Sequence, residues 1–456
     1  MRHRFSAHPR WLIILALALV VLIALVVTLL LSGAGKQAAR PTFSPTPTVI
    51  VSLLPSATPW LTPSPAASPT VDPVPPPMPT TTPQSTPAAT LPPAQTPTPT
   101  PSATPVPIPT APPGPTPTCV NLANWTVPQR LNQLMVVSAD FSNLSASVPD
   151  ARAGVGAFVL FGQPSAGSGP AISSGLAALY NNARASGQVL PWVATDEEGG
   201  SVARLAYVIG PLPSARQMAA QWTPAHAQNV MAAHAAAMWN LGVIMDLAPV
   251  LDTANPNNTI AEENQRSFSE NGQTAAAYGI AYANGLRASG VVPVVKHFPG
   301  LGHASANTDL GPATDPSLAQ LEANDLIPFE QAIAHGVPAI MVSHASVPGL
   351  TGTVPASLSP ATYEFLRNNL HFKGVTMTDS LGAGAISAAG YSQASAAVAA
   401  IEAGVDMVII NHVALPPTLS ALQQAINSGA LSLNQVNASV AQILVSKGHA
   451  VCRSSP

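Results

Sequence analysis

Charged side chains are scarce in this chain of 456 residues. Asp, Glu, Lys and Arg together make up 8% of it, and the formal net charge is −3 at pH 7. In an average globular chain about a quarter of the residues are charged. Beyond the extreme N-terminus there is no run of basic side chains, so nothing in the sequence favours binding to nucleic acid.

Cysteine is also rare, with only Cys119 and Cys452 in the whole chain. No group of His and Cys has the spacing of metal ligands, and no strand-like segment is followed by a glycine-rich phosphate loop. We therefore expect neither a metal nor a cofactor. The two cysteines lie near the two ends of the expected folded domain. They either form a disulfide, which requires that those ends meet, or remain free thiols.

The N-terminal residues 1–40 contain an uncharged apolar run at 11–31, preceded by Arg2, Arg4 and Arg10. At ~1.5 Å per residue this run is long enough to cross the roughly 30 Å hydrocarbon layer of a membrane. A signal-peptide core is shorter, about 7–15 residues. We interpret the run as an uncleaved transmembrane anchor. The arginines keep the N-terminus in the cytoplasm and place the rest of the chain outside the cell membrane. If the run is cleaved instead, the protein is secreted.

Residues 41–118 are mainly Pro, Thr, Ser and Ala, and they hold more than half of the 50 prolines. Proline removes hydrogen-bond donors and fixes φ, so this composition predicts a disordered, extended linker. At ~3.1 Å per residue the linker could hold a domain of the order of 200 Å from the membrane. The alternative is a disordered tail without a spacing role. No feature points to a protein partner.

Residues 119–456 alternate between apolar strand-like runs and alanine-rich helical stretches, which is typical of an α/β protein with a parallel sheet. The predicted strands are 134–137, 157–161, 192–194, 244–247, 291–295, 339–342, 375–377 and 407–410. The predicted helices include 171–185, 224–241, 272–288, 318–334 and 392–403, with two more in 421–447 split around Gly429. About eight such units predict a (β/α)8 TIM-type barrel.

Polar side chains follow the strand-like runs directly. Asp196, Glu197 and Glu198 come just after the third run, and Lys296 and His297 come just after the fifth. Further polar side chains after the fourth to seventh runs are Asp252, Arg266, His303, Asp309, His344 and Asp379. The C-terminal ends of parallel strands meet at one face of a barrel, where ligands bind.

This mixture of side chains indicates a neutral polyol as the ligand. Carboxylates accept hydrogen bonds from hydroxyl groups, and cationic side chains donate to them. Two acids on either side of a glycosidic bond can act as nucleophile and general acid. Asp379 has no cation within several residues and is the best candidate for the nucleophile.

Several ordered motifs resemble the family 3 glycoside hydrolases, and in particular their single-domain bacterial β-N-acetylhexosaminidase branch. The motifs are DEEGGSVARL at 196–205, APVLD at 248–252, RSF at 266–268, KHFPG at 296–300 and MTDSLGAGAI at 377–386. The similarity extends over nearly all of 119–450.

The resemblance implies retaining hydrolysis of a terminal β-N-acetylglucosaminide, with peptidoglycan fragments as the usual substrates of the branch. It implies that Asp379 is the nucleophile that forms the covalent glycosyl-enzyme. Five further positions match those that bind the non-reducing sugar, namely Asp196, Arg204, Arg266, Lys296 and His297.

One motif departs from the family. The branch carries Asp-Ser-His after KHFPG, where a His–Asp pair is the general acid/base, whereas this chain has Asn307, Thr308 and Asp309. Asp309 is the acid if a dry pocket raises its pKa. Alternatively, His303 is the acid and Asp309 orients it. A third possibility is that the site is impaired and the domain only binds carbohydrate. A β-glucosidase specificity is a further alternative.

Four polar residues keep a structural interpretation beside the functional one. Asp252 either caps a loop or belongs to the site, and His344 either contacts the ligand or lies behind it. Glu197 and Glu198 are expected to support their loop without touching sugar.

Overall fold

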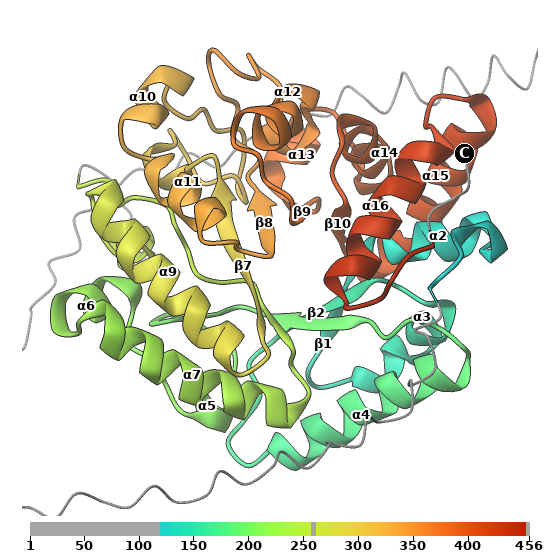
Figure 1. The fold of residues 1–456 in the computed structure, drawn as a ribbon, viewed down its shortest axis with the longest axis horizontal. Coiled ribbons are helices and arrows are strands. Elements are labelled where there is room, and N and C mark those ends of the chain that lie inside the picture. The colour runs from blue at the N-terminus through green and yellow to red at the C-terminus, as the bar shows by residue number, and fades with distance from the viewer. Residues whose placement is uncertain (1–118, 257–260, 453–456) are drawn as a thin grey trace, which may run out of the picture. The chain divides into compact units, whose positions relative to one another are not determined.

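Eight parallel strands close into a barrel in the computed structural model of the protein, which describes residues 119–256 and 261–452 (Figure 1). The strands are β1 (Met135–Asp140), β2 (Ala157–Phe161), β3 (Trp192–Thr195), β6 (Met245–Asp246), β7 (Val292–Phe298), β8 (Ala339–Val342), β9 (Val375–Ser380) and β10 (Met407–Ile410). Their order around the barrel is β1-β10-β9-β8-β7-β6-β3-β2, and β1 pairs with both β10 and β2. The predicted TIM-type barrel is confirmed.

Helices surround the strands in Figure 1. The longer ones are α4 (Gly169–Ala185), α7 (Pro224–Leu241), α9 (Gly272–Ala288), α11 (Ile327–Ala334), α14 (Gln393–Ala403), α15 (Leu415–Ser428) and α16 (Leu433–Ser446). The shorter ones are α2 (Val127–Gln133), α3 (Val148–Ala153), α5 (Ala206–Ile209), α6 (Ala215–Gln221), α8 (Ala261–Arg266), α10 (Leu318–Ala323), α12 (Pro360–Glu364) and α13 (Gly384–Ala388).

Local sequence signals explain the bounds of α7. The side chain of Thr223 accepts a hydrogen bond from the backbone N–H of His226, and Pro224 takes the first helical position. The helix ends at Gly242, whose φ of 97° few other residues adopt. Small residues let α7 and α9 pack closely. A Cβ on Gly285 of α9 would lie 2.5 Å from the carbonyl oxygen of Gln228 on α7.

Several predicted elements differ from the structure in their bounds. The strand predicted at 375–377 continues to Ser380, so Asp379 lies on β9 and not beyond it. The helix predicted at 318–334 is divided into α10 and α11, because the side chains of Asn324 and Asp325 bond to other segments and Pro328 begins a new helix. The strand predicted at 291–295 continues to Phe298, so Lys296 and His297 lie on β7 and not beyond it.

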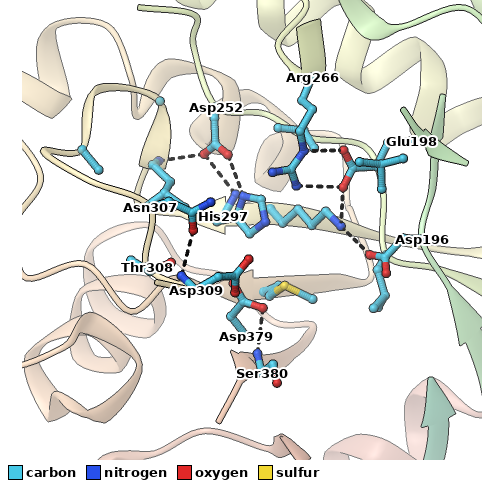
Figure 2. Close-up of a pocket in the computed structure, with 18 of the residues that line it drawn as sticks. Asp196, Glu198, Asp252, Arg266, His297, Asn307, Thr308, Asp309, Asp379 and Ser380 are labelled. Carbon is cyan, nitrogen blue, oxygen red and sulfur yellow. Dashed lines mark hydrogen bonds and ion pairs between the residues drawn. The ribbon is translucent and has the colours of Figure 1, made fainter. Parts of the chain in front are cut away.

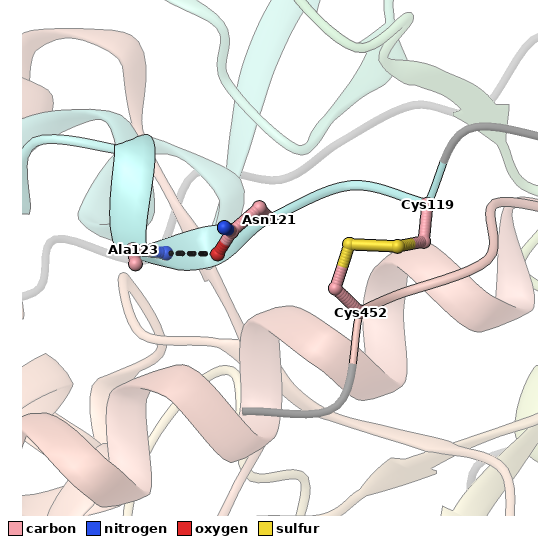
Figure 3. The surroundings of a disulfide bond; sticks show 4 residues. All are labelled: Cys119, Asn121, Ala123 and Cys452. Carbon is pink, nitrogen blue, oxygen red and sulfur yellow. Dashed lines mark hydrogen bonds between the residues drawn. A yellow bond between two sulfur atoms is a disulfide. The ribbon is translucent and has the colours of Figure 1, made fainter. Parts of the chain in front are cut away.

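Cys119 and Cys452 form a disulfide, with Cα atoms 4.9 Å apart (Figure 3). Next to it, Val120 and Val451 make a parallel β-bridge. The segment before α2 and the segment after α16 are therefore held side by side by both covalent and hydrogen bonds.

The anchor predicted in 1–40 and the linker predicted at 41–118 lie outside the described residues. Among the helices that the structure does describe, none is long and apolar enough to cross a membrane.

Candidate active site

A pocket of about 380 Å³ lies at the C-terminal ends of the barrel strands. Its walls include seven side chains that the sequence singled out as catalytic or sugar-binding, namely Asp196, Arg204, Arg266, Lys296, His297, Asp309 and Asp379. These residues span 184 positions of the chain (196 to 379, both included) and meet only because the barrel places successive strand ends side by side. The volume lies in the range of small-ligand sites, about 300–1,000 Å³.

Lys296 is the centre of an ion-pair network with Asp196 and Glu198 on one wall of the pocket, and Figure 2 shows Glu198 also facing Arg266. Its Nζ lies 2.8 Å from Asp196 Oδ1 and 2.7 Å from Glu198 Oε1. Arg266 donates to the same Glu198 through Nε at 2.8 Å and Nη2 at 2.9 Å. Burial alone would lower the pKa of Lys296, but the two carboxylates outweigh it and hold the pKa above its ordinary value. The ionised side chains of this wall are therefore held in fixed positions and are largely shielded from bulk water.

The two glutamates after Asp196 have different surroundings, although both were expected to support their loop without touching sugar. Neighbouring residues of a strand point to opposite sides. In the short hairpin of β4 (Glu197–Gly199) and β5 (Val202–Ala203), Glu198 lines the pocket. Glu197 is buried behind it, where it accepts from the backbone N–H of Leu205 and lies 3.1 Å from His234 Nε2. Only Glu197 acts as the expected loop support.

Asp252 both caps a loop and orients His297. Its Oδ1 accepts from the backbone N–H groups of His297 and Leu301, at 3.1 and 2.8 Å. Its Oδ2 lies 2.6 Å from His297 Nδ1. Both residues are buried, and both line the pocket. The two interpretations left open by the sequence therefore both apply to Asp252.

Asp379 lies on β9 and lines the pocket. The backbone N–H of Ser380 donates to its Oδ1 at 2.7 Å. Burial alone would raise the pKa of Asp379, but His297, the Ser380 N–H and Lys296 hold the pKa below its ordinary value. The carboxylate is therefore ionised at neutral pH.

His344 lies behind β9 and does not line the pocket. Its Nε2 donates to the Ser380 carbonyl at 2.8 Å, so its Nδ1, 2.7 Å from Ser357 Oγ, accepts from that hydroxyl. Burial lowers the pKa of His344, in agreement with a neutral ring. Its role is to position the backbone next to Asp379.

The loop after β7 brings Asp309 over Asp379, and Figure 2 shows the two carboxyl groups facing each other. Main-chain bonds hold the loop in place. The N–H groups of Gly384 and Ala385, at the start of α13, donate to the carbonyls of Asp309 and Thr308 at 2.8 and 3.0 Å. Partial burial and the charge of Asp379 raise the pKa of Asp309 above its ordinary value. The two facing carboxyls therefore have pKa values shifted in opposite directions.

We expect Gly384→Ala to reduce kcat by about tenfold or more, because overpacking displaces its neighbours. A Cβ at this position would lie 2.5 Å from the backbone carbon of Leu310 and 2.8 Å from the carbonyl oxygen of Asp309. The matched control is Gly311→Ala, where a Cβ meets nothing within 4 Å. Steady-state kinetics of both variants on one glycoside make the comparison. Equal activities would contradict a role for the close contact at Gly384.

His303 has a different environment from the one predicted. Its Nδ1 lies 2.7 Å from Asp325 Oδ1 and 3.3 Å from Thr253 Oγ1. The hydrogen bond to Asp325 raises the pKa of His303. The imidazole is therefore oriented by Asp325, and the prediction that Asp309 orients it is wrong. His303 is absent from the described residues that line the pocket.

The sequence did not predict the contact of Asp325 with His303 or the aromatic ring of Phe161 in the pocket lining. Asp325 lies in what was read as the middle of a helix, and only the break between α10 and α11 turns it toward the loop. Phe161 is the last residue of β2 and lines the pocket, with the Arg204 guanidinium 5.7 Å from its ring centre. In the described part of the chain, no group of three or more His, Cys, Asp or Glu could hold a metal ion.

Residues 126–445 match the family model described as the glycosyl hydrolase family 3 N-terminal domain. The chain belongs to glycosyl hydrolase family 3. The resemblance seen in the sequence motifs is thereby confirmed, and with it the expectation of a glycoside hydrolase. Family 3 membership agrees with the barrel and with a pocket at the C-terminal ends of its strands.

Relatives in family 3 cover most of the barrel. Beta-hexosaminidase LpqI of Mycobacterium tuberculosis is 36% identical over 264 residues, which is 56% of this chain and 68% of that protein. A family 3 glycosyl hydrolase structure from Mycobacterium smegmatis superposes with a TM-score of 0.66 at 35% identity, covering 73% of this chain and 99% of that one. A β-N-acetylhexosaminidase from Beutenbergia cavernae gives 0.64 at 30%, covering 72% and 99%.

Proposed function

We propose that this family 3 protein is a retaining glycosidase that releases terminal β-linked N-acetylglucosamine, with Asp379 as nucleophile and Asp309 as general acid/base. The observation that carries the proposal is the pair of facing carboxyls with opposite pKa shifts in one sugar-sized pocket. Such a pair assigns the ionised group to attack and the protonated group to proton donation. Relatives named as a β-hexosaminidase and a β-N-acetylhexosaminidase support N-acetylglucosamine as the sugar that is released.

The first half of the reaction transfers the sugar to the protein. Asp379 attacks the anomeric carbon while the bond to the leaving oxygen breaks, and Asp309 gives its proton to that oxygen. In the second half, Asp309 takes a proton from water as the water oxygen attacks the anomeric carbon. The bond to Asp379 breaks, and both carboxyls return to their starting states.

The ion-pair wall is proposed to bind the non-reducing sugar. Asp196 and Glu198 accept from its hydroxyls, while Lys296, Arg266 and Arg204 donate to them. His297, oriented by Asp252 through Nδ1, offers Nε2 to another hydroxyl. These groups are already paired with each other, so little reorganisation is needed when a sugar binds.

A panel of p-nitrophenyl β-glycosides tests the proposal on the purified protein. We expect release from the N-acetylglucosaminide, and NMR of the first-formed product should show the β-anomer. The α-anomer would contradict retention, and a preference for the glucoside would indicate a β-glucosidase. Binding of N-acetylglucosamine without any turnover would indicate a carbohydrate-binding protein.

We also propose that the barrel lies outside the cytoplasm, attached to the membrane by the anchor predicted at 11–31. The disulfide supports an oxidising compartment. A protein named as a secreted glycosyl hydrolase, from Arthroderma benhamiae, is 35% identical over 297 residues. Fractionation of cells that make the full chain should find it in membranes and cleaved by external protease. Recovery in the soluble cytoplasm would contradict this location.

A further inference from the structure

A second cavity, of about 530 Å³, adjoins the pocket over the ends of β1 and β10. The residues that line it include Ser138, Asp140, Asn143, Phe161, Asn411 and His412. Asp309, Ser380 and Phe161 line both spaces. The two cavities therefore meet at the acid of the proposed reaction.

This position fits the leaving group of the substrate. The sugar-binding side chains Asp196, Arg266 and Lys296 line only the first pocket, so the non-reducing sugar belongs there. A general acid must lie within reach of the leaving oxygen. The leaving sugar must then extend past Asp309, and on that side the second cavity has room for a further ring.

The charged side chains that line the second cavity determine which leaving groups it can accept. The backbone N–H of Ser142 donates to Asp140 at 2.7 Å and holds the pKa of Asp140 below its ordinary value, so this carboxylate is ionised. His412 Nδ1 lies 2.9 Å from Asp150 Oδ2, so any positive charge on the ring is balanced there. The described residues that line the cavity include no Lys or Arg.

Uncharged groups in the cavity suit sugar hydroxyls and C–H faces. Ser138, Asn143 and Asn411 supply hydroxyl and amide groups, and Phe161 supplies a ring between the two cavities. The Arg204 guanidinium lies 5.7 Å from the centre of the Phe161 ring, but Arg204 lines the first pocket, where its Nε lies 3.9 Å from Asp196 Oδ2.

We propose that the second cavity is the leaving-group site and that it selects an uncharged amino sugar over one that carries a carboxylate. The inference rests on the proposed function and narrows it. A muramic sugar with a free lactyl carboxylate would bring its charge into the cavity lined by the ionised Asp140, and like charges repel. An N-acetylglucosamine unit carries no such charge.

Two disaccharides test this selection with the full chain. Both have a non-reducing β-1,4-linked N-acetylglucosamine, and the second sugar is either N-acetylglucosamine or N-acetylmuramic acid with a free carboxylate. We expect kcat/KM to be at least about tenfold higher for the uncharged one. Equal values, or a preference for the muramic sugar, would overturn the inference.

Asp140→Asn should lower this preference by about threefold or more, through a higher kcat/KM for the muramic substrate. The control is Glu364→Gln on α12, an exposed acid that lines neither cavity and should leave the ratio unchanged. If Asp140→Asn and Glu364→Gln give the same ratio, Asp140 does not select the leaving group.

Salt gives an independent measurement that needs no variant. Raising the ionic strength should narrow the preference of the unsubstituted protein, because screening weakens the repulsion of exposed charges. A preference that salt leaves unchanged would contradict charge as its cause. Hydrolysis of the aryl N-acetylglucosaminide by the same preparation keeps the two ideas separate, since its absence refutes the proposed function and not the selection alone.

Discussion

Asp379→Ala is expected to lower kcat/KM by about four orders of magnitude or more on every glycoside that the protein hydrolyses. The substitution removes the atom that forms the covalent intermediate, and water in its place is neither oriented nor activated. Asp379→Asn keeps the shape but is a far poorer nucleophile, so the loss should be similarly large. Initial rates on the aryl N-acetylglucosaminide measure both.

Circular dichroism should show that the Asp379 variants keep the fold, because the surrounding barrel positions this side chain and does not depend on it. His344 and Ser380 bond to one another through backbone and ring atoms without the carboxylate. Activity of either variant within tenfold of the unsubstituted protein would remove Asp379 from the nucleophile role.

Asp309→Asn is expected to cost about 10²–10⁴-fold on disaccharides, which is the usual contribution of a general acid. The loss in kcat/KM should be much smaller on aryl glycosides with an activated leaving group, because such a group departs without protonation. His303→Ala is the matched test of the other candidate acid. Since His303 bonds to Asp325 and Thr253, its loss should lower activity only modestly and equally for both kinds of substrate.

The pH profile provides a second readout for Asp309. Asp379 must be ionised to attack, and its lowered pKa means that activity declines only when the pH falls to acidic values. Asp309 must carry its proton in the first step. Because its pKa is raised, activity should persist to a higher pH before it declines. Asp309→Asn should abolish this upper limb. An unchanged upper limb, or a larger substrate-dependent loss in His303→Ala, would assign the acid elsewhere.

The sequence predicted the barrel well because strands buried on both faces leave uninterrupted apolar runs. Such runs at 157–161, 339–342 and 407–410 match β2, β8 and β10 residue for residue. The end of β7 was missed because charged residues resemble a loop, although here their charges are neutralised by pairing inside the barrel. The hairpin of β4 and β5 was missed because it is very short and contains buried acids.

Within the site, residue types at strand ends predicted seven of the side chains that line the pocket, but Phe161 was missed and His303, also predicted, is not among the lining residues. Their partners could not be predicted. Glu198 pairs with Arg266 across 68 positions, and His303 pairs with Asp325 across 22, and no local pattern signals contacts over such separations. Asp325 also depends on a break in a helix that the alanine-rich composition hides.

The loop over the nucleophile is joined to α13 by hydrogen bonds between main-chain atoms of Thr308, Asp309, Gly384 and Ala385. Such an attachment tolerates changes of side chain as long as the backbone path is kept. A different proton donor could therefore take this place on the loop without any change in the barrel strands. If Asp309 is the proton donor as proposed, the Asn-Thr-Asp triplet supplies a carboxyl group over Asp379 from a loop that these main-chain bonds hold in place.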